Sequence, residues 1–272
     1  MCSSVRWYFN SGKWNPNRSD LLLASSCIQS EEKERLGRFY FQKDFKPSLI
    51  GRLMMRKYVS ESCQNDYRSV LFNRDDKGKP FLANFSTPVA FNVSHHGNYV
   101  VFVGELDNSL VGVDVMKLEY SGGKTLPEFF RIMKRNFSDM EWSTIYSCAG
   151  DKDKIEMFCR LWCLKESYVK AIGVGITLKL NDLSFNIATK QLTKDCLVKD
   201  TKLYIKGERQ SEWYFEETLI DDEHCVAIGS NKKISGPAFQ EISFGELVRN
   251  AVPLLPEDSL FCDSVLAKPE RP

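Results

Sequence analysis

Apolar side chains recur every three or four residues in two long stretches of the chain, residues 45–59 and 158–172. That spacing places them on one face of an α-helix, so both stretches are predicted to be long amphipathic helices. The second is expected to begin near Asp153 and to stop at Gly173, a typical helix-ending residue. Shorter helical patterns and capping residues predict further helices at 20–23, from Ser30, at 127–133, at 139–148 and at 244–251.

Short apolar and β-branched runs between these helices predict strands. They are residues 5–9, 70–72, 81–82, 89–94, 99–105, 110–116, 183–187, 202–205, 213–217 and 225–228. Helices and strands are therefore mixed in both halves of the chain. A polar seam at 107–109 predicts one domain at 1–108, a second at 109–230 and a proline-rich tail at 231–272 that docks in part. We expect the last ten residues to be loose.

Composition narrows the classes of function. The 272 residues are 43% hydrophobic with a formal net charge of +1, so no bulk field gathers nucleic acid or membrane. The nine cysteines lack a paired Cys-x-x-Cys spacing, which argues against a disulfide scaffold or a zinc module. We find neither a signal-peptide pattern nor an apolar run near the roughly 20 residues of a membrane span. We expect a soluble cytosolic protein with no nucleic-acid or membrane partner.

One carboxylate interrupts the apolar strand at 110–116. The period of a strand puts the valines of this run on one face and Gly112, Asp114 and Met116 on the other. A buried carboxylate is costly unless it is paired or binds a metal, so Asp114 requires a partner. On this residue alone, an aspartate that ends a strand and caps a turn explains the pattern as well as a functional site does.

A second carboxylate lies on the predicted helix at 158–172. Trp162, Glu166 and Lys170 fall on one stripe of that helix. In water an i,i+4 Glu–Lys pair is worth only about 0.2–0.5 kcal/mol, so stability alone gives little reason for it. Together Asp114 and Glu166 would form an oxygen-ligand site suited to Mg²⁺, and this favours function over the capping alternative.

Two motifs resemble the signature of a known enzyme family. Gly112-Val113-Asp114, followed by Trp162-Cys163-Leu164-Lys165-Glu166-Ser167-Tyr168-Val169-Lys170, resembles the (V/I)-G-(V/I)-D and W-x-x-K-E-(S/A)-x-x-K motifs of 4′-phosphopantetheinyl transferases. Upstream, Asn92-Val93-Ser94-His95 and Lys77-Gly78-Lys79-Pro80 are similar to the family's N-x-S-H and G-K-P segments. The long N-terminal half resembles the larger, surfactin-synthetase-type branch, and within it the animal cytosolic enzymes.

The resemblance implies a fold and a reaction. The fold would be α+β, with two similar α/β subdomains that form a pseudo-dimer and an active site in the cleft between them. Phosphopantetheine would pass from coenzyme A to a serine of an apo carrier domain, and adenosine 3′,5′-bisphosphate would be released. Carrier domains of fatty-acid synthase and of aminoadipate-semialdehyde dehydrogenase would be the partners, and the chain would act as a monomer.

The resemblance also implies roles for individual residues. Asp114 and Glu166 would hold Mg²⁺, Glu166 would serve as general base, and Lys170 would stabilise or protonate the departing phosphate. Lys165 would act either as a phosphate ligand or as an ordinary exposed lysine. The residues expected to bind coenzyme A in the first half are Arg35, Arg74, Lys77, Gly78, Lys79, Asn92, Val93, Ser94 and His95.

Several of these positions have simpler explanations. Composition alone would favour an ordinary solvated loop for the turn at 74–80, in which Gly78 otherwise lets backbone N–H groups approach an anion. His96 is expected at the surface, with His95 directed into the site. The basic residues of the helix at 45–59 are expected on a solvated face, with contact to an acidic carrier as the alternative. They are Arg52, Arg56 and Lys57.

Met116 departs from the pattern D-x-E found in many family members. A thioether is a poor Mg²⁺ ligand, so weaker metal binding is expected without substrate. Two other functions stay open: a non-catalytic module that binds coenzyme A or a carrier, and an acyltransferase with His95 as base. The first conflicts with the intact Asp114, Glu166 and Lys170, and the second lacks a nucleophilic partner for His95.

Overall fold

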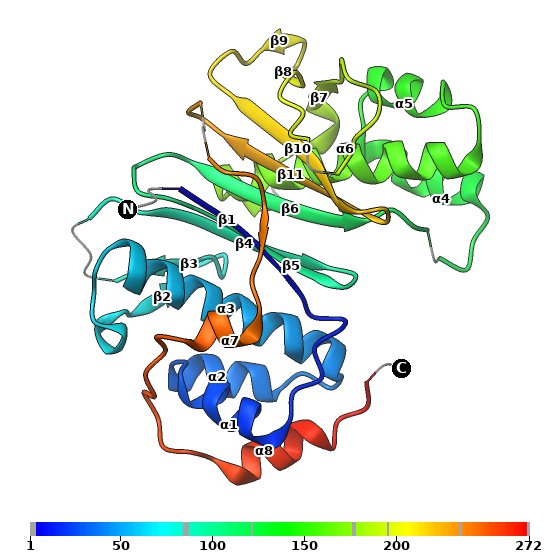
Figure 1. Ribbon diagram of the computed structural model, residues 1–272. Helices are drawn as coiled ribbons and strands as arrows, with labels where there is room; N and C mark the ends of the chain where they lie inside the picture. Colours follow the sequence, from blue (N-terminus) through cyan, green and yellow to red (C-terminus); the bar gives the residue numbers. More distant parts are fainter. Residues whose placement is uncertain are drawn as a thin grey trace. The chain divides into compact units, whose positions relative to one another are not determined.

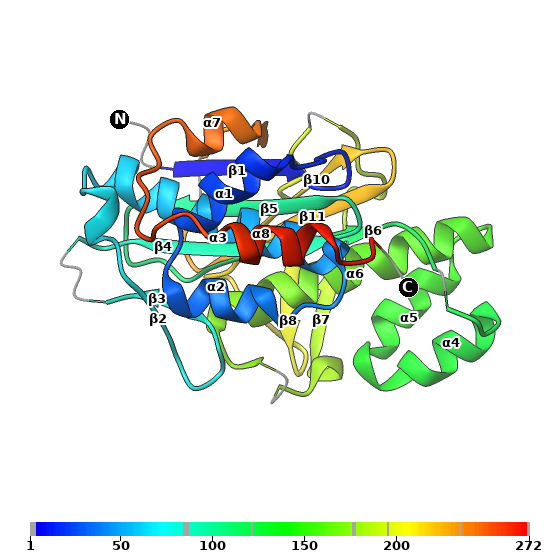
Figure 2. The same cartoon turned by 90° about the horizontal axis from the view of Figure 1, so that it is seen from below.

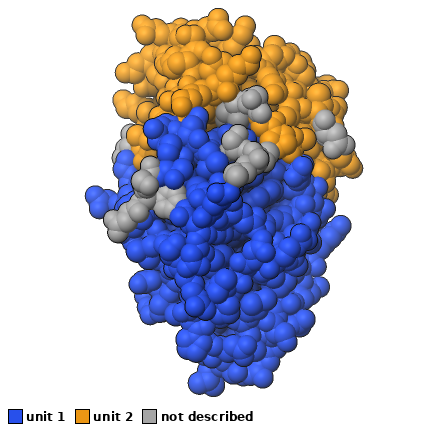
Figure 3. Space-filling view, turned by 60° about the vertical axis from the view of Figure 1, so that its left-hand side comes forward, with its two compact units in different colours: residues 1–108, 239–272 blue, residues 109–238 orange. Residues whose placement is uncertain are grey.

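The computed structural model describes residues 4–83, 87–120, 122–175, 178–194, 196–233 and 236–270 (Figure 1). The chain divides into two compact units, unit 1 with residues 1–108 and 239–272 and unit 2 with residues 109–238, coloured separately in Figure 3. Each unit has its own hydrophobic core. Helices and sheets occur in both, which confirms the α+β class. Within the described ranges, no helix is long and apolar enough to cross a bilayer.

Unit 1 is built on a four-stranded sheet of order β12-β1-β5-β4. Strand β12 is parallel to β1, and the other neighbours are antiparallel. Its strands are β1 (Ser4–Asn10), β4 (Ala90–His96), β5 (Tyr99–Glu105) and β12 (Gln240–Glu241), with a separate hairpin of β2 (Phe72–Arg74) and β3 (Pro80–Leu82). Its helices are α1 (Arg18–Ser26), α2 (Ser30–Gly37), α3 (Gln42–Ser62), α7 (Phe244–Val248) and α8 (Ser259–Leu266).

The long helix α3 packs on β4 and β5, which explains its apolar period. Gly51 of α3 lies against Val93 of β4, where a Cβ would be 3.3 Å from a methyl carbon. Tyr58 fills the space above Gly104 of β5, where a Cβ would be 2.4 Å from its ring. Small residues at these two points therefore let the helix and the sheet approach closely.

The C-terminal segment belongs to unit 1. Strand β12 extends the sheet, Phe244 stacks on Trp14 with ring centroids 5.1 Å apart, and α8 packs against α1 (Figure 2). The expectation of loose final residues is wrong for 263–270, because the Gln42 amide donates to the Pro269 carbonyl at 3.0 Å and Lys46 pairs with Glu270 at 2.7 Å. The separate tail at 231–272 is thus replaced by a segment built into the first unit.

Unit 2 is built on a three-stranded antiparallel sheet of order β10-β11-β6. Its strands are β6 (Val111–Lys117), β10 (Tyr214–Asp221) and β11 (His224–Ser230), and a second small sheet contains β7 (Leu183–Asn186), β8 (Lys202–Ile205) and β9 (Glu208–Arg209). Its α-helices are α4 (Leu126–Met133), α5 (Asp139–Tyr146) and α6 (Asp151–Ile172). Gly173 ends α6 in the left-handed conformation at φ 68°, as predicted.

The long helix α6 packs on β6 and β11 at very short range. A Cβ on Gly112 would be 2.1 Å from the Ser167 carbonyl oxygen and 2.5 Å from the Ala171 amide nitrogen. Only glycine permits this approach of strand backbone to helix backbone. The face of β6 that carries Gly112, Asp114 and Met116 therefore points at α6.

The two units share one topology, although the sequence has no visible repeat. In each, a first strand leads through shorter helices to a long helix, then to a small hairpin or sheet, then to a final hairpin. The last strand of that hairpin pairs antiparallel with the first strand, as β1-β5-β4 in unit 1 and β6-β11-β10 in unit 2. This agreement in topology supports the predicted similarity of the two subdomains.

Candidate active site

The carboxylate of Asp114 has the partner that its burial requires. Asp114 is 5% exposed in the middle of β6, opposite Ala227 of β11, so it neither ends the strand nor caps a turn. Its Oδ1 accepts a hydrogen bond from Lys170 Nζ of α6 at 2.6 Å. The Lys170 side chain is 29% exposed, so the pair lies at the edge of the core. The two family motifs meet through this ion pair.

Glu166 lies one helical turn before Lys170 and belongs to the same electrostatic cluster. Burial raises the pKa of Glu166 above its usual range, the negative charge of Asp114 raises it further, and the Lys170 ammonium opposes both effects. Two carboxylates and one ammonium thus interact at one point between β6 and α6. The like-charge repulsion between Asp114 and Glu166 is what a divalent cation would relieve.

The donor set of this cluster fits Mg²⁺, which prefers a small number of carboxylates together with water and phosphate oxygens. Over the described ranges of the chain, no group of three or more His, Cys, Asp or Glu side chains is placed to hold a metal ion. Met116, on the same strand face, is partly buried and packs against the core of unit 2. The protein ligands for a cation here would therefore be Asp114 and Glu166, without a third carboxylate.

In unit 1, three of the basic residues lie around one carboxylate. Glu32 of α2 accepts from Arg74 Nε at 2.7 Å and Nη2 at 2.8 Å, and from Arg52 Nε of α3 at 2.7 Å. Burial lowers the pKa of Arg52, and the positive charges of Arg74 and of Arg35, which is exposed one turn after Glu32 in α2, lower it further. The structure thus joins Arg74 to Arg52 through Glu32, with Arg35 on the same helix as Glu32.

The turn between β2 and β3 is folded around Asp75. The Asp75 carboxylate accepts from the backbone amides of Lys77 at 2.9 Å and Lys79 at 2.8 Å, and its carbonyl accepts from the Gly78 amide at 2.9 Å. Gly78 takes the left-handed φ of 82°, as a tight turn requires. These amides are occupied within the turn, so the expected backbone contacts to an anion are not supported, and the Lys77 and Lys79 side chains remain the candidates.

The Asn92–His95 segment forms the middle and end of β4. Because side chains alternate along a strand, Asn92 and Ser94 share one face, and Val93 and His95 share the other, against which α3 packs at Val93. Ser94 is buried and His95 is exposed. The strand thus separates Ser94 from His95, although they are adjacent in the motif. His96 is also exposed, as expected.

Comparison with known proteins places this chain in a family. A model described as "4'-phosphopantetheinyl transferase, N-terminal" matches residues 12–107, and one described as "4'-phosphopantetheinyl transferase superfamily" matches residues 110–229. The chain belongs to the 4′-phosphopantetheinyl transferase superfamily. Its two compact units correspond closely to the two matched segments.

Individual proteins similar to this chain are also named phosphopantetheinyl transferases. The chain is 40% identical over 287 aligned positions to the human L-aminoadipate-semialdehyde dehydrogenase-phosphopantetheinyl transferase, covering 98% of this chain and 93% of that protein. It is 38% identical to the protein of that name from Xenopus laevis, covering 99% and 94%. The 4′-phosphopantetheinyl transferase Sfp of Bacillus subtilis is 32% identical over 163 positions, covering 60% of this chain and 67% of the relative.

Lys165, next to Glu166 in the phosphopantetheinyl transferase motif, is neither exposed nor open to a ligand phosphate. Its side chain is fully buried, and its Nζ contacts Glu141 Oε2 at 2.8 Å and donates to the carbonyls of Leu180 at 2.8 Å and Leu183 at 2.7 Å. Both expectations for Lys165 are therefore wrong. Its ammonium instead joins α6 to the start of α5 and to the segment that enters β7.

The expectation that the basic residues of α3 form a solvated face is also wrong. Arg56 is 1% exposed and donates to the carbonyls of Tyr67 at 2.5 Å and Val70 at 2.9 Å. Arg52 is held by Glu32, and the Lys57 side chain is only 12% exposed and pairs with Glu61 at 2.6 Å. These long side chains cover the helix and fix the segment that follows it, so none of them forms an open basic surface.

Two buried features of unit 2 escaped sequence reasoning. The first is Glu141, the buried partner of Lys165. Glu141 is the third helical residue after Ser138, and the Ser-x-x-Glu capping box that they form is the sequence pattern that could have drawn attention to it. Arg160 of α6 forms a two-pronged ion pair with Glu217 of β10, at 2.7 and 3.0 Å, and no local pattern announces it.

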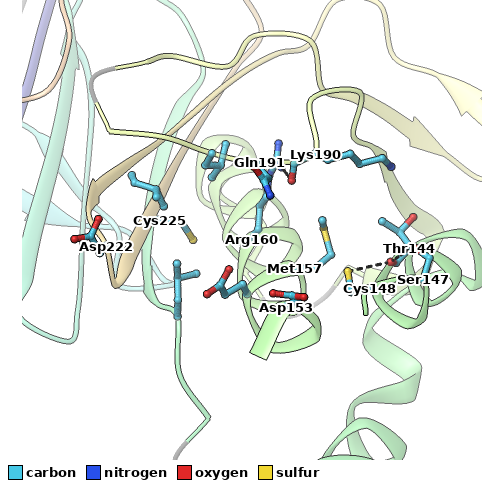
Figure 4. A pocket seen from close by; sticks show the side chains of 14 residues that line it. Thr144, Ser147, Cys148, Asp153, Met157, Arg160, Lys190, Gln191, Asp222 and Cys225 are labelled. Carbon is cyan, nitrogen blue, oxygen red and sulfur yellow. Dashed lines mark hydrogen bonds between the residues drawn. The ribbon is translucent and has the colours of Figure 1, made fainter. Parts of the chain in front are cut away.

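A cavity of about 520 Å³ lies beside Arg160 and Met157 on α6 (Figure 4). Its lining also includes Cys148, Asp153 and Cys225. At 100° per residue, Arg160 and Met157 project from a different flank of α6 than Glu166. The cavity is therefore separate from the carboxylate cluster.

Proposed function

We propose that this chain transfers the 4′-phosphopantetheine group of coenzyme A to a serine of apo carrier domains and releases adenosine 3′,5′-bisphosphate. Membership of the transferase superfamily supports the reaction class. The observation that carries the proposal is the cluster of Asp114, Glu166 and Lys170. Phosphoryl transfer needs carboxylates for a metal ion, a proton acceptor and a cation for the phosphate, and this cluster has all three groups. A non-catalytic binding module would have no use for a buried Asp114 and a partly buried Glu166 whose charges oppose each other.

The residues of unit 2 would divide the chemistry between them. Asp114 and Glu166 would hold Mg²⁺, which when bound would neutralise negative charge on the pyrophosphate. Glu166 would also accept the proton of the carrier serine, and burial, which raises the pKa of its carboxyl, makes the carboxylate a stronger proton acceptor. Lys170 would stabilise or protonate the departing phosphate, and its ion pair with Asp114 keeps its ammonium at this point.

The residues of unit 1 would bind the coenzyme. Arg35 and Arg74 provide guanidinium groups for a phosphate, and Lys77 and Lys79 add two ammonium groups on the neighbouring turn. Ser94 and His95 of β4 stay candidates for phosphate contacts, as do Asn92, Val93 and Gly78 for positioning. The pseudo-dimer with a shared cleft stays a prediction.

The relatives suggest which carriers are served. Several are named for L-aminoadipate-semialdehyde dehydrogenase, and the carrier domain of such an enzyme is the first partner that we propose for this chain. The carrier domain of fatty-acid synthase is the second. We further propose that the chain works as a monomer in the cytosol, with Mg²⁺ as its metal.

Release of the nucleotide product tests this function. Coenzyme A and MgCl₂ should yield adenosine 3′,5′-bisphosphate on a chromatogram only when both this chain and an apo carrier are present. If coenzyme A stays intact in the full mixture, the transferase function is lost. If an acyl group passes from acyl-coenzyme A while the phosphopantetheine bond stays intact, the acyltransferase alternative is correct.

Met116→Glu should tighten Mg²⁺ binding in the absence of coenzyme A. Met116 shares a strand face with Asp114, so a glutamate there would add a third carboxylate. Isothermal titration with MgCl₂ should give an affinity about tenfold or more above that of the parent chain. Met116→Gln, which adds no charge, serves as the control. Unchanged affinity in Met116→Glu would mean that position 116 does not face the metal.

A further inference from the structure

Lys170 and the proposed metal ion need the same carboxylate. The Lys170 ammonium donates to Asp114 Oδ1 at 2.6 Å, which is a short, charge-assisted hydrogen bond. Asp114 is one of the two proposed ligands of Mg²⁺, and its side chain is only 7% exposed. A cation bound to either oxygen of this carboxylate would lie beside the ammonium, and the two positive charges would repel each other at short range.

The charges of the cluster favour one cation over two. Asp114 and Glu166 carry two negative charges when both are ionised, so a single Mg²⁺ balances them. With Lys170 still held in its ion pair, the site would be left with one excess positive charge at the edge of the core of unit 2. The metal would therefore bind best when the ammonium has moved to another anion.

The backbone holds Asp114 in place, whereas the Lys170 side chain has room to move. Strand β6 pairs with β11 along its length, and Gly112 brings β6 against the backbone of α6, so the position of the carboxylate is fixed. Lys170 lies in the last turn of α6, its side chain is 29% exposed, and lysine has a flexible four-carbon stem. Its ammonium can turn to a neighbouring anion without a change in the backbone.

We propose that Lys170 and Mg²⁺ exchange places at Asp114, so that metal binding depends on a coenzyme phosphate that accepts the ammonium. This inference rests on the proposed function and deepens it. Before the coenzyme binds, Lys170 neutralises Asp114 and competes with the cation. When a phosphate lies beside the cluster, Lys170 turns to it, and the released carboxylate oxygen of Asp114 becomes available to the metal. The affinities for coenzyme and for metal are thereby coupled, and each raises the other.

The affinity for Mg²⁺ in the absence of coenzyme A measures this competition directly. In isothermal titration with MgCl₂, Lys170→Met should bind about 10- to 100-fold more tightly than the parent chain, because the competing ammonium is gone. Lys170→Arg keeps a cation beside Asp114 and should stay within about threefold of the parent chain. The exchange is overturned if Lys170→Met binds Mg²⁺ no more tightly than the parent chain, or if Lys170→Arg gains as much affinity as Lys170→Met.

Lys117→Gln separates exchange at Asp114 from a general change in charge. Lys117 follows Asp114 by three residues on β6, so its side chain projects from the opposite face of the strand, and it pairs with Glu119 at 2.5 Å. This variant removes one positive charge near the site but leaves the Asp114–Lys170 pair intact. Its Mg²⁺ affinity should stay within about threefold of the parent chain. A gain as large as that of Lys170→Met would mean that the field of nearby charges, and not exchange, governs metal binding.

Thermal unfolding shows whether Lys170→Met is folded and gives a second measure of the exchange. This variant leaves the buried Asp114 carboxylate without its cation, so its Tm should be below that of the parent chain when no metal is added. A ligand that binds the folded state raises its stability, so MgCl₂ should raise the Tm of Lys170→Met by more than it raises the Tm of the parent chain. An equal or smaller rise would contradict the exchange.

The two proposals fail in different ways. A parent chain that transfers no phosphopantetheine to an apo carrier contradicts the proposed function. An active parent chain, together with a Lys170→Met variant that gains no affinity for Mg²⁺, contradicts only the exchange at Asp114.

Discussion

Glu166→Gln should lower kcat for phosphopantetheine transfer by about 10³-fold or more. Glutamine keeps the shape of the side chain but removes a negative charge that would hold the metal and accept the serine proton, two tasks lost at once. The neighbouring Asp114–Lys170 ion pair does not involve Glu166, so the fold of unit 2 should persist. Because burial and the charge of Asp114 already disfavour the ionised carboxylate, thermal stability should change little or rise slightly.

The matched control is Glu156→Gln on the same helix. The Glu156 side chain is 38% exposed and pairs with Lys152 at 3.6 Å. Glu156 lies more than two helical turns before Glu166 along α6, away from the cluster of Asp114, Glu166 and Lys170. It should keep the parent rate. Turnover by Glu166→Gln within a few-fold of the parent chain would show that Glu166 has neither assigned role.

Lys165→Met should lower the free energy of unfolding by about 3–5 kcal/mol, because it leaves the fully buried Glu141 carboxylate without its cation. Glu141 would still accept hydrogen bonds from the Ser138 amide at 2.9 Å and the Phe185 amide at 3.2 Å. These bonds soften the loss but do not supply a positive charge. Urea denaturation of the parent chain and of Lys165→Met in parallel measures this difference in the free energy of unfolding.

A double variant separates a lost charge partner from lost packing. Lys165→Met with Glu141→Gln removes both charges, while the amide keeps the shape of the side chain and its single oxygen can still accept from the Ser138 amide at the cap of α5. More than half of the lost stability should return, because an unpaired buried charge is the main cost. If the double variant is no more stable than Lys165→Met alone, the defect is one of packing around residue 165.

Strand patterns predicted which residues share the face of β6 that meets α6. The alternation along β6 placed Asp114 on the face of Gly112 and Met116, and the contact of Gly112 with α6 confirms that this face meets the helix. The long helices and most strands also lie where the periodicity placed them, since both periods depend only on neighbouring residues. Local rules therefore sufficed for most elements and for the strand side of the proposed site.

Long-range coverage explains what the sequence could not predict. A helical wheel treats Lys165, Arg52 and Arg56 as polar positions, but each is covered by a segment distant in sequence. Lys165 is covered by the chain around Leu180 and Leu183, and Arg56 by the turn at Tyr67 and Val70. Lys165 and Arg52 each meet a carboxylate from another helix, and Arg56 meets two backbone carbonyls beyond its own helix, so partners from elsewhere satisfy donors of each cation. The same limit hid Glu32, whose role depends on three elements.

The intact mass of an apo carrier domain, measured after incubation with this chain, coenzyme A and MgCl₂, tests the central claim most directly. The account predicts that the carrier gains the mass of one phosphopantetheinyl group. It also predicts no gain when the acceptor serine of the carrier is replaced by alanine. An unchanged mass with the native carrier, under conditions in which the chain is folded, would contradict it.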